Sequence, residues 1–480
     1  MLIASILLYL AASIAIGLWA ARRVHNPRDY MIAGRSLPLY MSVATVFATW
    51  FGAETMLGVS STFLKEGLGG IVADPFGFSV TLVIVALFFA RAFYRLNLLT
   101  IGDFYRDRYN KPVEVATSVC IVVSYLGWTS AQFTALGLVL HTLSGGAIPL
   151  AWGIVLGAGC VLVYTLFGGM WAVAFTDLFQ SVIIVLGLAY LAFLLGGMAG
   201  GFEVVVAHAA EAGKLQFWPG AEAKEVLAFA AAFLTAALGS IPQQDVFQRI
   251  TSAKDAPTAV RGSLIGGIAY FFMAFVPVYL AYSALLIDAP MVEPLLAGDA
   301  NENQLILPNL ILGHTPVFAQ VMFFGALLSA IMSSASGALL APASLFSENV
   351  LRPFVPHMGE RQFLLTLRLV LVIFGLAVMV FALTSDASIY QMVQNAYKVT
   401  LVSAFAPLVL GLYWKRSTTA GALLAVVLGL VTWLMMEGFA ADALIPPQLV
   451  GLGFSFAGMV LGSLFTRAAP HPHPQHRAHG

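Results

Sequence analysis

The sequence predicts an all-α polytopic membrane protein, and three observations support this fold class. The chain has 480 residues, of which 60% are hydrophobic and only 10% are charged. Soluble proteins carry about 25% charged residues, and the mean hydropathy here is +0.90. The apolar residues gather in thirteen segments, each close to the length of about 20 residues that crosses a bilayer. These features exclude a soluble protein and predict one membrane domain over residues 1–468.

The thirteen segments follow one another along the chain, most of them joined by short connections. They are 2–21, 38–63, 70–93, 113–142, 149–168, 175–199, 226–246, 262–287, 316–345, 363–383, 388–413, 420–436 and 447–466. Basic residues follow the first segment (Arg22, Arg23) instead of preceding it, so we interpret this segment as a retained helix and not as a cleaved signal peptide.

Positive charge is sorted between alternate loops. With the N-terminus outside and the C-terminus in the cytoplasm, most lysines and arginines lie inside, as the positive-inside rule requires. Lys65, Lys214 and Lys224 lie outside, and Lys398 falls within a segment. We expect an integral protein with this orientation in a bacterial inner (plasma) membrane.

Several connecting segments carry their own predictions. The external stretches 200–224 and 288–314 are long enough for some structure, and the internal run 100–111 is polar and expected to be helical. The His- and Pro-rich tail 469–480 is expected to be disordered and cytoplasmic. Cys120 and Cys160 lie in apolar segments, so we expect packing and no disulfide.

The second segment has polar residues at its centre. Trp50, Gly52 and Glu54 stand in the middle of an apolar run. A carboxylate at membrane depth costs a few kcal/mol at least, and glycine allows the helix to break and frees backbone carbonyls. Interrupted helices with polar groups at mid-depth form the binding sites of transporters.

The seventh segment is interrupted in the same way. Gly239 and Pro242 break its helical pattern, and the polar residues Ser240, Gln243, Gln244 and Asp245 lie around the break. Segments 2 and 7 correspond if residues 38–199 and 226–413 form two repeats of five helices. A pair of broken helices at corresponding positions indicates a transporter site; the alternative is a proline kink in a packed helix.

Segment 9 carries a run of small hydroxyl residues. Ser333 and Ser336 share a helical face with Ala330, and Ser334 lies beside them. Hydroxyls and freed carbonyls are the oxygen ligands that hard cations prefer, so the run is a candidate sodium site. The alternative is helix packing, with the serines bonded back along their own helix.

Three other polar positions lie within apolar segments. Trp128 and Gln132 are one turn apart in segment 4, and an indole face can hold a cation. Asp177 opens segment 6, where capping is the simplest interpretation. Lys398 must find a partner; we expect a structural ion pair, with a role in coupling as the alternative.

Taken together, these residues resemble the sodium/solute symporter family, which includes sodium–glucose, proline and sialic acid transporters. The resemblance covers nearly the whole chain and is closest to the high-affinity choline transporter branch. Its motifs are GRSLPLYMSVATVFATWFGAET (34–55), TIGDFYRDRY (100–109), YTLFGGMWAVAFTDLFQ (164–180), IPQQDVFQRITSAKD (241–255) and SAIMSSASGALLAPASLFSENV (329–350). It implies a LeuT-type fold with 5+5 inverted repeats, one preceding helix and two following helices.

The resemblance also implies ion sites. A primary sodium ion would be held by the carbonyls of Ala48, Phe51 and Ala330 and the hydroxyls of Ser333 and Ser334. Some members of the family hold a second sodium ion, which here would involve Asp177, Ser333 and Ser336. The remaining serine of that second site is replaced by Gly337, so one sodium ion is expected and a second is open.

For the solute, the resemblance implies a modified aromatic cage. Trp50 and Trp128 match two tryptophans of the choline branch, Gln243 replaces the third, and Glu54 replaces a glycine. A cationic or zwitterionic solute fits this mixture, with Gln243 and Gln132 at its polar end. The candidate solute-binding residues are Trp50, Gly52, Glu54, Trp128, Gln132, Ser240 and Gln243; Asp177, Ser336 and Lys398 are candidates for a second sodium ion or for coupling.

We therefore expect a sodium-coupled symporter that imports a small polar solute by alternating access. A proton-coupled transporter, with Lys398 or Glu54 titrating, and a solute sensor without transport are the alternatives. No HExxH, GxSxG or histidine pair lies in the segments, so an enzyme is not expected. The expected partners are the solute, sodium and the lipid bilayer, without nucleic acid; the sequence does not specify an oligomeric state.

Overall fold

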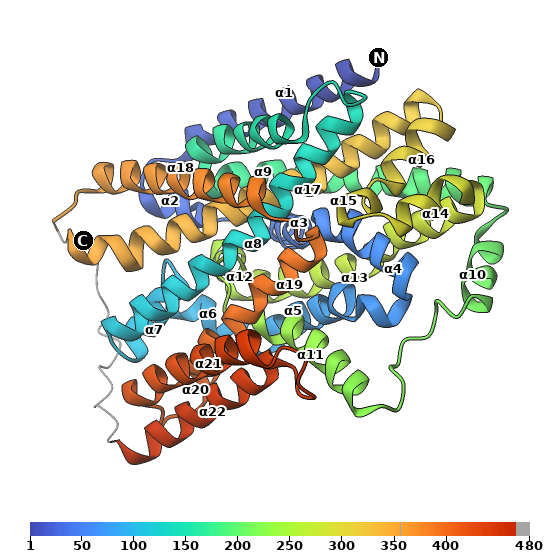
Figure 1. Ribbon diagram of the computed structural model, residues 1–480. Coiled ribbons are helices and arrows are strands. Elements are labelled where there is room, and N and C mark those ends of the chain that lie inside the picture. Colours follow the sequence, from blue (N-terminus) through green and yellow to red (C-terminus); the bar gives the residue numbers. More distant parts are fainter. Residues whose placement is uncertain (356, 467–480) are drawn as a thin grey trace.

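The computed structural model describes residues 1–355 and 357–466, and all regular secondary structure in this part is helical. The α-helices, shown in Figure 1, are α1 (Leu2–Ala20), α2 (Pro27–Ile32), α3 (Leu39–Trp50), α4 (Val59–Glu66), α5 (Phe78–Ile84), α6 (Ala90–Leu96), α7 (Ile101–Arg108), α8 (Lys111–Leu143), α9 (Leu150–Met198), α10 (Phe202–Glu211), α11 (Ala223–Gly239), α12 (Gln244–Ser252), α13 (Ala256–Ile287), α14 (Ala289–Ala297), α15 (Ala300–Asn303), α16 (Ile306–His314), α17 (Val317–Leu345), α18 (Glu360–Thr384), α19 (Ile389–Thr400), α20 (Ala406–Tyr413), α21 (Thr419–Phe439) and α22 (Pro447–Phe465).

Short π-helical and 3₁₀ turns continue several of these helices. The π-helical turns are Glu54–Gly58, Val72–Gly77, Val85–Phe89, Phe346–Leu351 and Leu401–Phe405. The 3₁₀ turns are Ala21–Arg23, Ala33–Arg35, Leu68–Ile71 and Arg352–Phe354. The predicted tail 469–480 lies outside the described residues.

The helices account for the predicted spans. Ten helical stretches within 1–355 and 357–466 are long and apolar enough to cross a bilayer, and the bent pair α11 and α12 makes eleven. The 49-residue α9 would be about 74 Å long at about 1.5 Å per residue, more than twice the hydrocarbon thickness of about 30 Å. Gly169 (φ +50°) interrupts α9, which therefore holds both predicted spans 149–168 and 175–199.

The remaining predicted span, 38–63, is divided between α3, the turn Glu54–Gly58 and α4, so no single helix covers it. Counting it and both halves of α9 gives the thirteen predicted spans. The break in segment 7 is also confirmed, because α11 ends at Gly239 and α12 begins at Gln244 with a bend of 43°. Both predicted repeats thus begin with a broken helix, although the repeat boundaries 38–199 and 226–413 stay a prediction.

The broken helices lie at the centre of the bundle. Figure 1 shows α3 near the middle, and α3 packs against α9, α12, α13 and α17. α21 and α22 pack on each other at one side of the bundle. A short parallel bridge joins the ends of the two broken segments: Leu37 N donates to Ser252 O, and Lys254 N donates to Leu37 O, both at 3.0 Å.

The polar run 100–111 forms the helix that the sequence predicts. Thr100 caps α7, because its hydroxyl accepts from Asp103 N and its own N–H donates to the Asp103 carboxylate, each at 3.2 Å. Ile101 N donates to Gln244 Oε1 at 2.8 Å, and Tyr105 OH donates to Ala404 O at 2.9 Å. These bonds fasten α7 to the broken segment 7 and to the turn that precedes α20.

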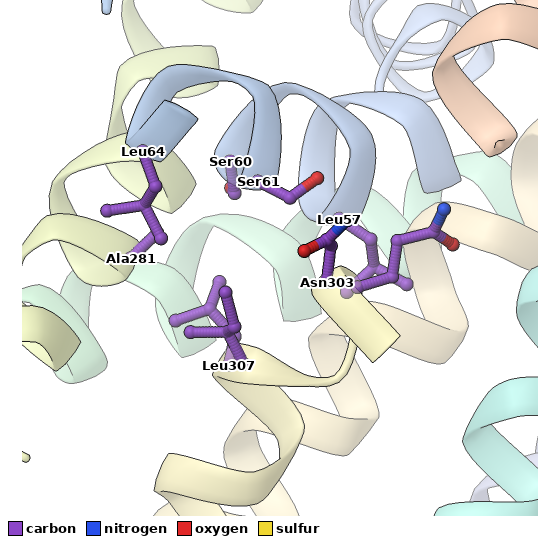
Figure 2. Close-up of a pocket in the computed structure, with 9 residues that line it drawn as sticks. Leu57, Ser60, Ser61, Leu64, Ala281, Asn303 and Leu307 are labelled. Atoms are coloured by element: carbon purple, nitrogen blue, oxygen red, sulfur yellow. The ribbon is translucent and has the colours of Figure 1, made fainter. Parts of the chain in front are cut away.

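The two predicted external stretches also contain helices. Residues 200–224 include α10, and residues 288–314 include α14, α15 and α16. Figure 2 shows a small cavity where α15 and α16 meet α4, between Ser60 and Ser61 on one side and Asn303 and Leu307 on the other. The stretch 288–314 therefore packs against the second half of segment 2.

Candidate functional site

The backbone breaks where segment 2 carries its polar residues. α3 ends at Trp50, and Phe51 has φ −88° and ψ 79°, which turns its carbonyl out of the helical hydrogen-bond ladder. The chain resumes as the π-helical turn at Glu54. A Cβ on Gly52 would lie 2.7 Å from both Glu54 Oε2 and Ser334 Oγ, so this close approach requires glycine.

Serine hydroxyls of α17 meet carbonyl oxygens at the end of α3. Ser333 Oγ donates to Ala48 O at 2.8 Å and to Ala330 O at 3.0 Å. Ser334 Oγ donates to Thr49 O at 2.9 Å and lies 3.4 Å from Ala48 O. All of these residues are fully buried.

This oxygen cluster has the chemistry of an alkali-cation site. Its hydroxyl and carbonyl oxygens converge from two helices at mutual distances of 2.8 to 3.4 Å. Hard cations are held by such oxygens, and a set without a formal charge suits a monovalent ion that must also leave. Both hydroxyls bond across to α3, and Ser333 also bonds back to Ala330 O of its own helix, as the packing alternative expects. Thr49 O joins the set and was not predicted.

Glu54 is held by the two residues that sequence analysis placed one turn apart in α8. Gln132 Nε2 donates to Glu54 Oε2 at 2.8 Å, and Trp128 Nε1 donates to Glu54 Oε1 at 3.4 Å. Gln132 Oε1 in turn accepts from Ala53 N at 3.0 Å. Gln132 therefore satisfies a backbone donor freed by the break and fixes the direction of the carboxylate.

An aromatic cluster lies beside Glu54. The rings of Trp50 and Tyr397 are stacked, with centroids 6.4 Å apart, and the Trp128 centroid lies 6.2 Å from that of Tyr397. Phe78 packs at 5.1 Å from both Trp50 and Tyr397. The two predicted tryptophans are thus brought together by Tyr397 and Phe78, which sequence analysis missed.

A second buried carboxylate, also missed, adjoins the cluster. Asp74 Oδ2 accepts from Thr55 Oγ1 at 3.0 Å, and its Oδ1 accepts from Tyr270 OH. Asp74 and Glu54 lie near enough for their charges to interact. The signal was an Asp-Pro pair near the start of the apolar segment 70–93, where an acidic residue is as unexpected as Glu54.

The break in segment 7 is bonded to α8, α19 and α5. Gln243 Nε2 donates to Ser124 Oγ at 3.0 Å and to Thr400 Oγ1 at 3.3 Å. Ser240 Oγ lies 3.0 Å from Thr81 Oγ1 and donates to Ala236 O at 2.5 Å. Both predicted residues are buried and bonded to neighbouring helices, so they position the break between α8, α19 and α5.

Asp177 does not cap a helix, so that interpretation was wrong. It lies within α9, because the helix resumes immediately after Gly169 and continues through the predicted start of segment 6. Both its carboxylate oxygens are buried and without a hydrogen-bond partner among the described residues. Ser336 Oγ donates to Ser333 O at 2.9 Å, along its own helix.

Lys398 forms the ion pair that was expected as its structural role. Its Nζ lies 2.9 Å from Glu437 Oε1 in α21, and Trp433 Nε1 donates to the same oxygen at 3.2 Å. Its partner is thus Glu437 and none of the buried carboxylates Glu54, Asp177 and Asp245.

A model of the sodium:solute symporter family matches residues 30–429, which include every candidate residue above. The chain belongs to this family. It is 27% identical over 451 residues to a high-affinity choline transporter of Caenorhabditis elegans. The alignment covers 89% of this chain and 76% of the choline transporter.

Other members of the family are similarly related. The sodium/glucose cotransporter of Vibrio parahaemolyticus is 26% identical, covering 88% of this chain and 82% of that one. The solved structure of a Na⁺-coupled sialic acid symporter in a substrate-bound, outward-open state superimposes with a TM-score of 0.81 at 18% identity, covering 97% and 98% of the two chains. The LeuT-type fold is thus confirmed, and the relatives are transporters and not enzymes.

Proposed function

We propose that this protein is a sodium-coupled symporter that imports a small cationic or zwitterionic organic solute. The observation that carries the proposal is that the oxygen cluster and the aromatic cluster adjoin each other at the break in segment 2. A Cβ at Gly52 would lie 2.7 Å from both Ser334 Oγ and Glu54 Oε2, so an ion at the serines and a solute at the carboxylate would both bear on the same break in segment 2.

The pocket chemistry favours a positively charged group on the solute. Trp50, Trp128 and Tyr397 offer aromatic faces, which attract ammonium groups. Glu54 and Asp74 add two buried carboxylates, whose burial is costly unless a cation or hydrogen bonds compensate it. The choline and sodium/glucose relatives show that the family transports solutes of different kinds, so the carboxylates and not family membership carry this part of the proposal.

Coupling follows from the two helices that the ion joins. Sodium bound between Ala48 O, Thr49 O and the two serines would tie α17 to α3 and fix the break, so that Glu54 and Trp50 are presented to the solute. Trp50, Glu54 and Ser333 are buried in the interior of the bundle. Each sodium ion moving inward contributes about 2.3 kcal/mol per 100 mV of membrane potential.

The proton-coupled alternative rests on the carboxylates of Glu54 and Asp74, because Lys398 is paired with Glu437. A proton gradient would then replace the sodium gradient, and the serine cluster would have no role in coupling. A sensor would bind solute and sodium without net movement. Both alternatives are separated from symport by flux measurements on the purified protein.

The solute class is tested by thermal stability in detergent. Quaternary amines, amino acids, sugars and carboxylates are screened in sodium and in potassium buffer. We expect amines or zwitterions to raise the melting temperature in sodium only, because ligand binding stabilises the folded state by mass action. Stabilisation confined to sugars or to anionic carboxylates would contradict the cationic part of the proposal, and equal shifts in potassium would contradict sodium coupling.

A further inference from the structure

A buried arginine stands next to the proposed sodium site. Arg249 in α12 is 3% exposed, and its Nε donates to Thr49 Oγ1 at 3.0 Å. Its Nη1 and Nη2 are buried without a hydrogen-bond partner among the described residues. Thr49 also supplies a carbonyl to Ser334, so the guanidinium and the oxygen cluster share one residue of α3.

The guanidinium occupies space that a side chain at position 337 would need. A Cβ built on Gly337 would lie 2.4 Å from Arg249 Nη2, 3.4 Å from Cζ and 3.7 Å from Nη1. Gly337 is one residue after Ser336 and four residues after Ser333 in α17. The absence of a side chain at Gly337 therefore admits the positive charge between α12 and α17.

Two buried carboxylates lie within electrostatic range of this guanidinium. Arg249 lies close enough to Asp177 in α9 and to Asp245 in α12 to act on both carboxylates electrostatically. Asp245 is also bonded to Tyr125, whereas the oxygens of Asp177 have no hydrogen-bond partner in the described part of the chain. Arg249 therefore acts on Asp177 through space, and no ion pair joins the two side chains in the described part of the chain.

These residues do not fit a second sodium ion. The expected set was Asp177, Ser333 and Ser336 with a further serine, but position 337 has no hydroxyl. Ser336 Oγ bonds to its own helix, and the guanidinium fills the space beside Gly337. A sodium ion there would meet a fixed positive charge at short range in a medium of low dielectric constant, where like charges repel strongly.

We propose that Arg249 is a built-in cation that takes the place of a second sodium ion, so that this transporter couples each solute molecule to one sodium ion. Gly337 is the residue that permits it. This inference rests on the proposed sodium symport and adds its stoichiometry. Because Arg249 stays with the protein, it contributes no ion to the driving force.

The stoichiometry is measured on the wild-type protein in proteoliposomes. The solute found in the stability screen is taken up against a tenfold inward sodium gradient with the membrane potential clamped at zero. One coupled ion supports about tenfold accumulation at equilibrium and two support about 100-fold, because the driving free energies add. We expect about tenfold; accumulation near 100-fold would overturn the inference.

Paired variants test the roles of Arg249 and Gly337. Arg249→Gln with Gly337→Ser removes the guanidinium and supplies a hydroxyl, so we expect accumulation to rise toward about 100-fold. Arg249→Gln with Gly337→Ala is the matched control without the hydroxyl, and we expect it to stay at about tenfold or below. Equal accumulation in both pairs would overturn the assignment of Arg249 to an ion's place.

The result remains decisive if a pair fails to fold, because the wild-type ratio needs no variant. Failure of the inference is also distinct from failure of the proposed function. Uptake that needs no sodium refutes symport itself, whereas sodium-dependent uptake with a ratio of two refutes only the role of Arg249. Sodium-dependent melting temperatures of each variant show whether a site is gained independently of uptake.

Discussion

Replacement of both Ser333 and Ser334 by alanine is expected to abolish sodium-stimulated uptake. The two hydroxyls supply the α17 side of the oxygen cluster, bonded to Ala48 O and Thr49 O at 2.8 and 2.9 Å. Hydrogen bonds to charged groups contribute about 1.5–3 kcal/mol each, and we expect a similar scale for each lost oxygen–ion contact. The loss is therefore about 100-fold or more in sodium affinity. Initial uptake rates at increasing sodium concentration measure it.

Ser329→Ala is the matched control for this double variant. Ser329 lies one turn earlier in the same helix, but its hydroxyl donates to Tyr9 OH of α1 at 2.9 Å, away from α3. We expect its sodium dependence to resemble that of the wild type. A Ser333→Ala/Ser334→Ala variant that inserts, folds and keeps the wild-type sodium dependence would show that the oxygen cluster is packing and not an ion site.

Glu54→Gln is expected to weaken solute binding strongly while changing sodium affinity less. The carboxylate accepts from both Trp128 Nε1 and Gln132 Nε2, and an amide can accept only one of these while it presents a donor to the other. The variant also loses the negative charge beside the aromatic faces. Loss of a charge-assisted contact of about 2 kcal/mol corresponds to about a 30-fold increase in the KM for a cationic solute.

A charge-swapped variant provides the control. Glu54→Gln combined with Gln132→Glu returns one carboxylate and one amide to the same pair, which are 2.8 Å apart. We expect the swap to recover part of the lost affinity, because the pocket regains its charge. If Glu54→Gln binds the solute as well as the wild type, or if the swap recovers nothing, Glu54 is not the counter-charge of the solute.

Site residues that are marked by local spacing within a single helix could be predicted from the sequence. The break at Gly52, the break between Gly239 and Gln244, and the pairing of Trp128 with Gln132 all follow from local spacing. The Ser333 and Ser334 hydroxyls could be proposed as ligands, because hydroxyls beside a freed carbonyl are few in an apolar segment. These local signals identified, for each helix, the residues that it contributes to the site.

Residues that depend on distant neighbours could not be predicted in the same way. Tyr397 is one of many membrane aromatics, and only its stacking on Trp50 marks it. Asp177 was mistaken for a cap because α9 resumes directly after Gly169, before the predicted start of segment 6 at 175. The place of Arg249 beside Gly337 joins residues 88 positions apart, which no spacing rule connects.

Solute accumulation by the wild-type protein under separate ion gradients tests the central claim most directly. The protein is reconstituted in liposomes with an inward sodium gradient and no pH gradient, and then with the pH gradient alone. The account predicts accumulation with the sodium gradient, its collapse when a sodium ionophore is added, and none with the pH gradient. Accumulation driven by the pH gradient in sodium-free buffer would contradict it.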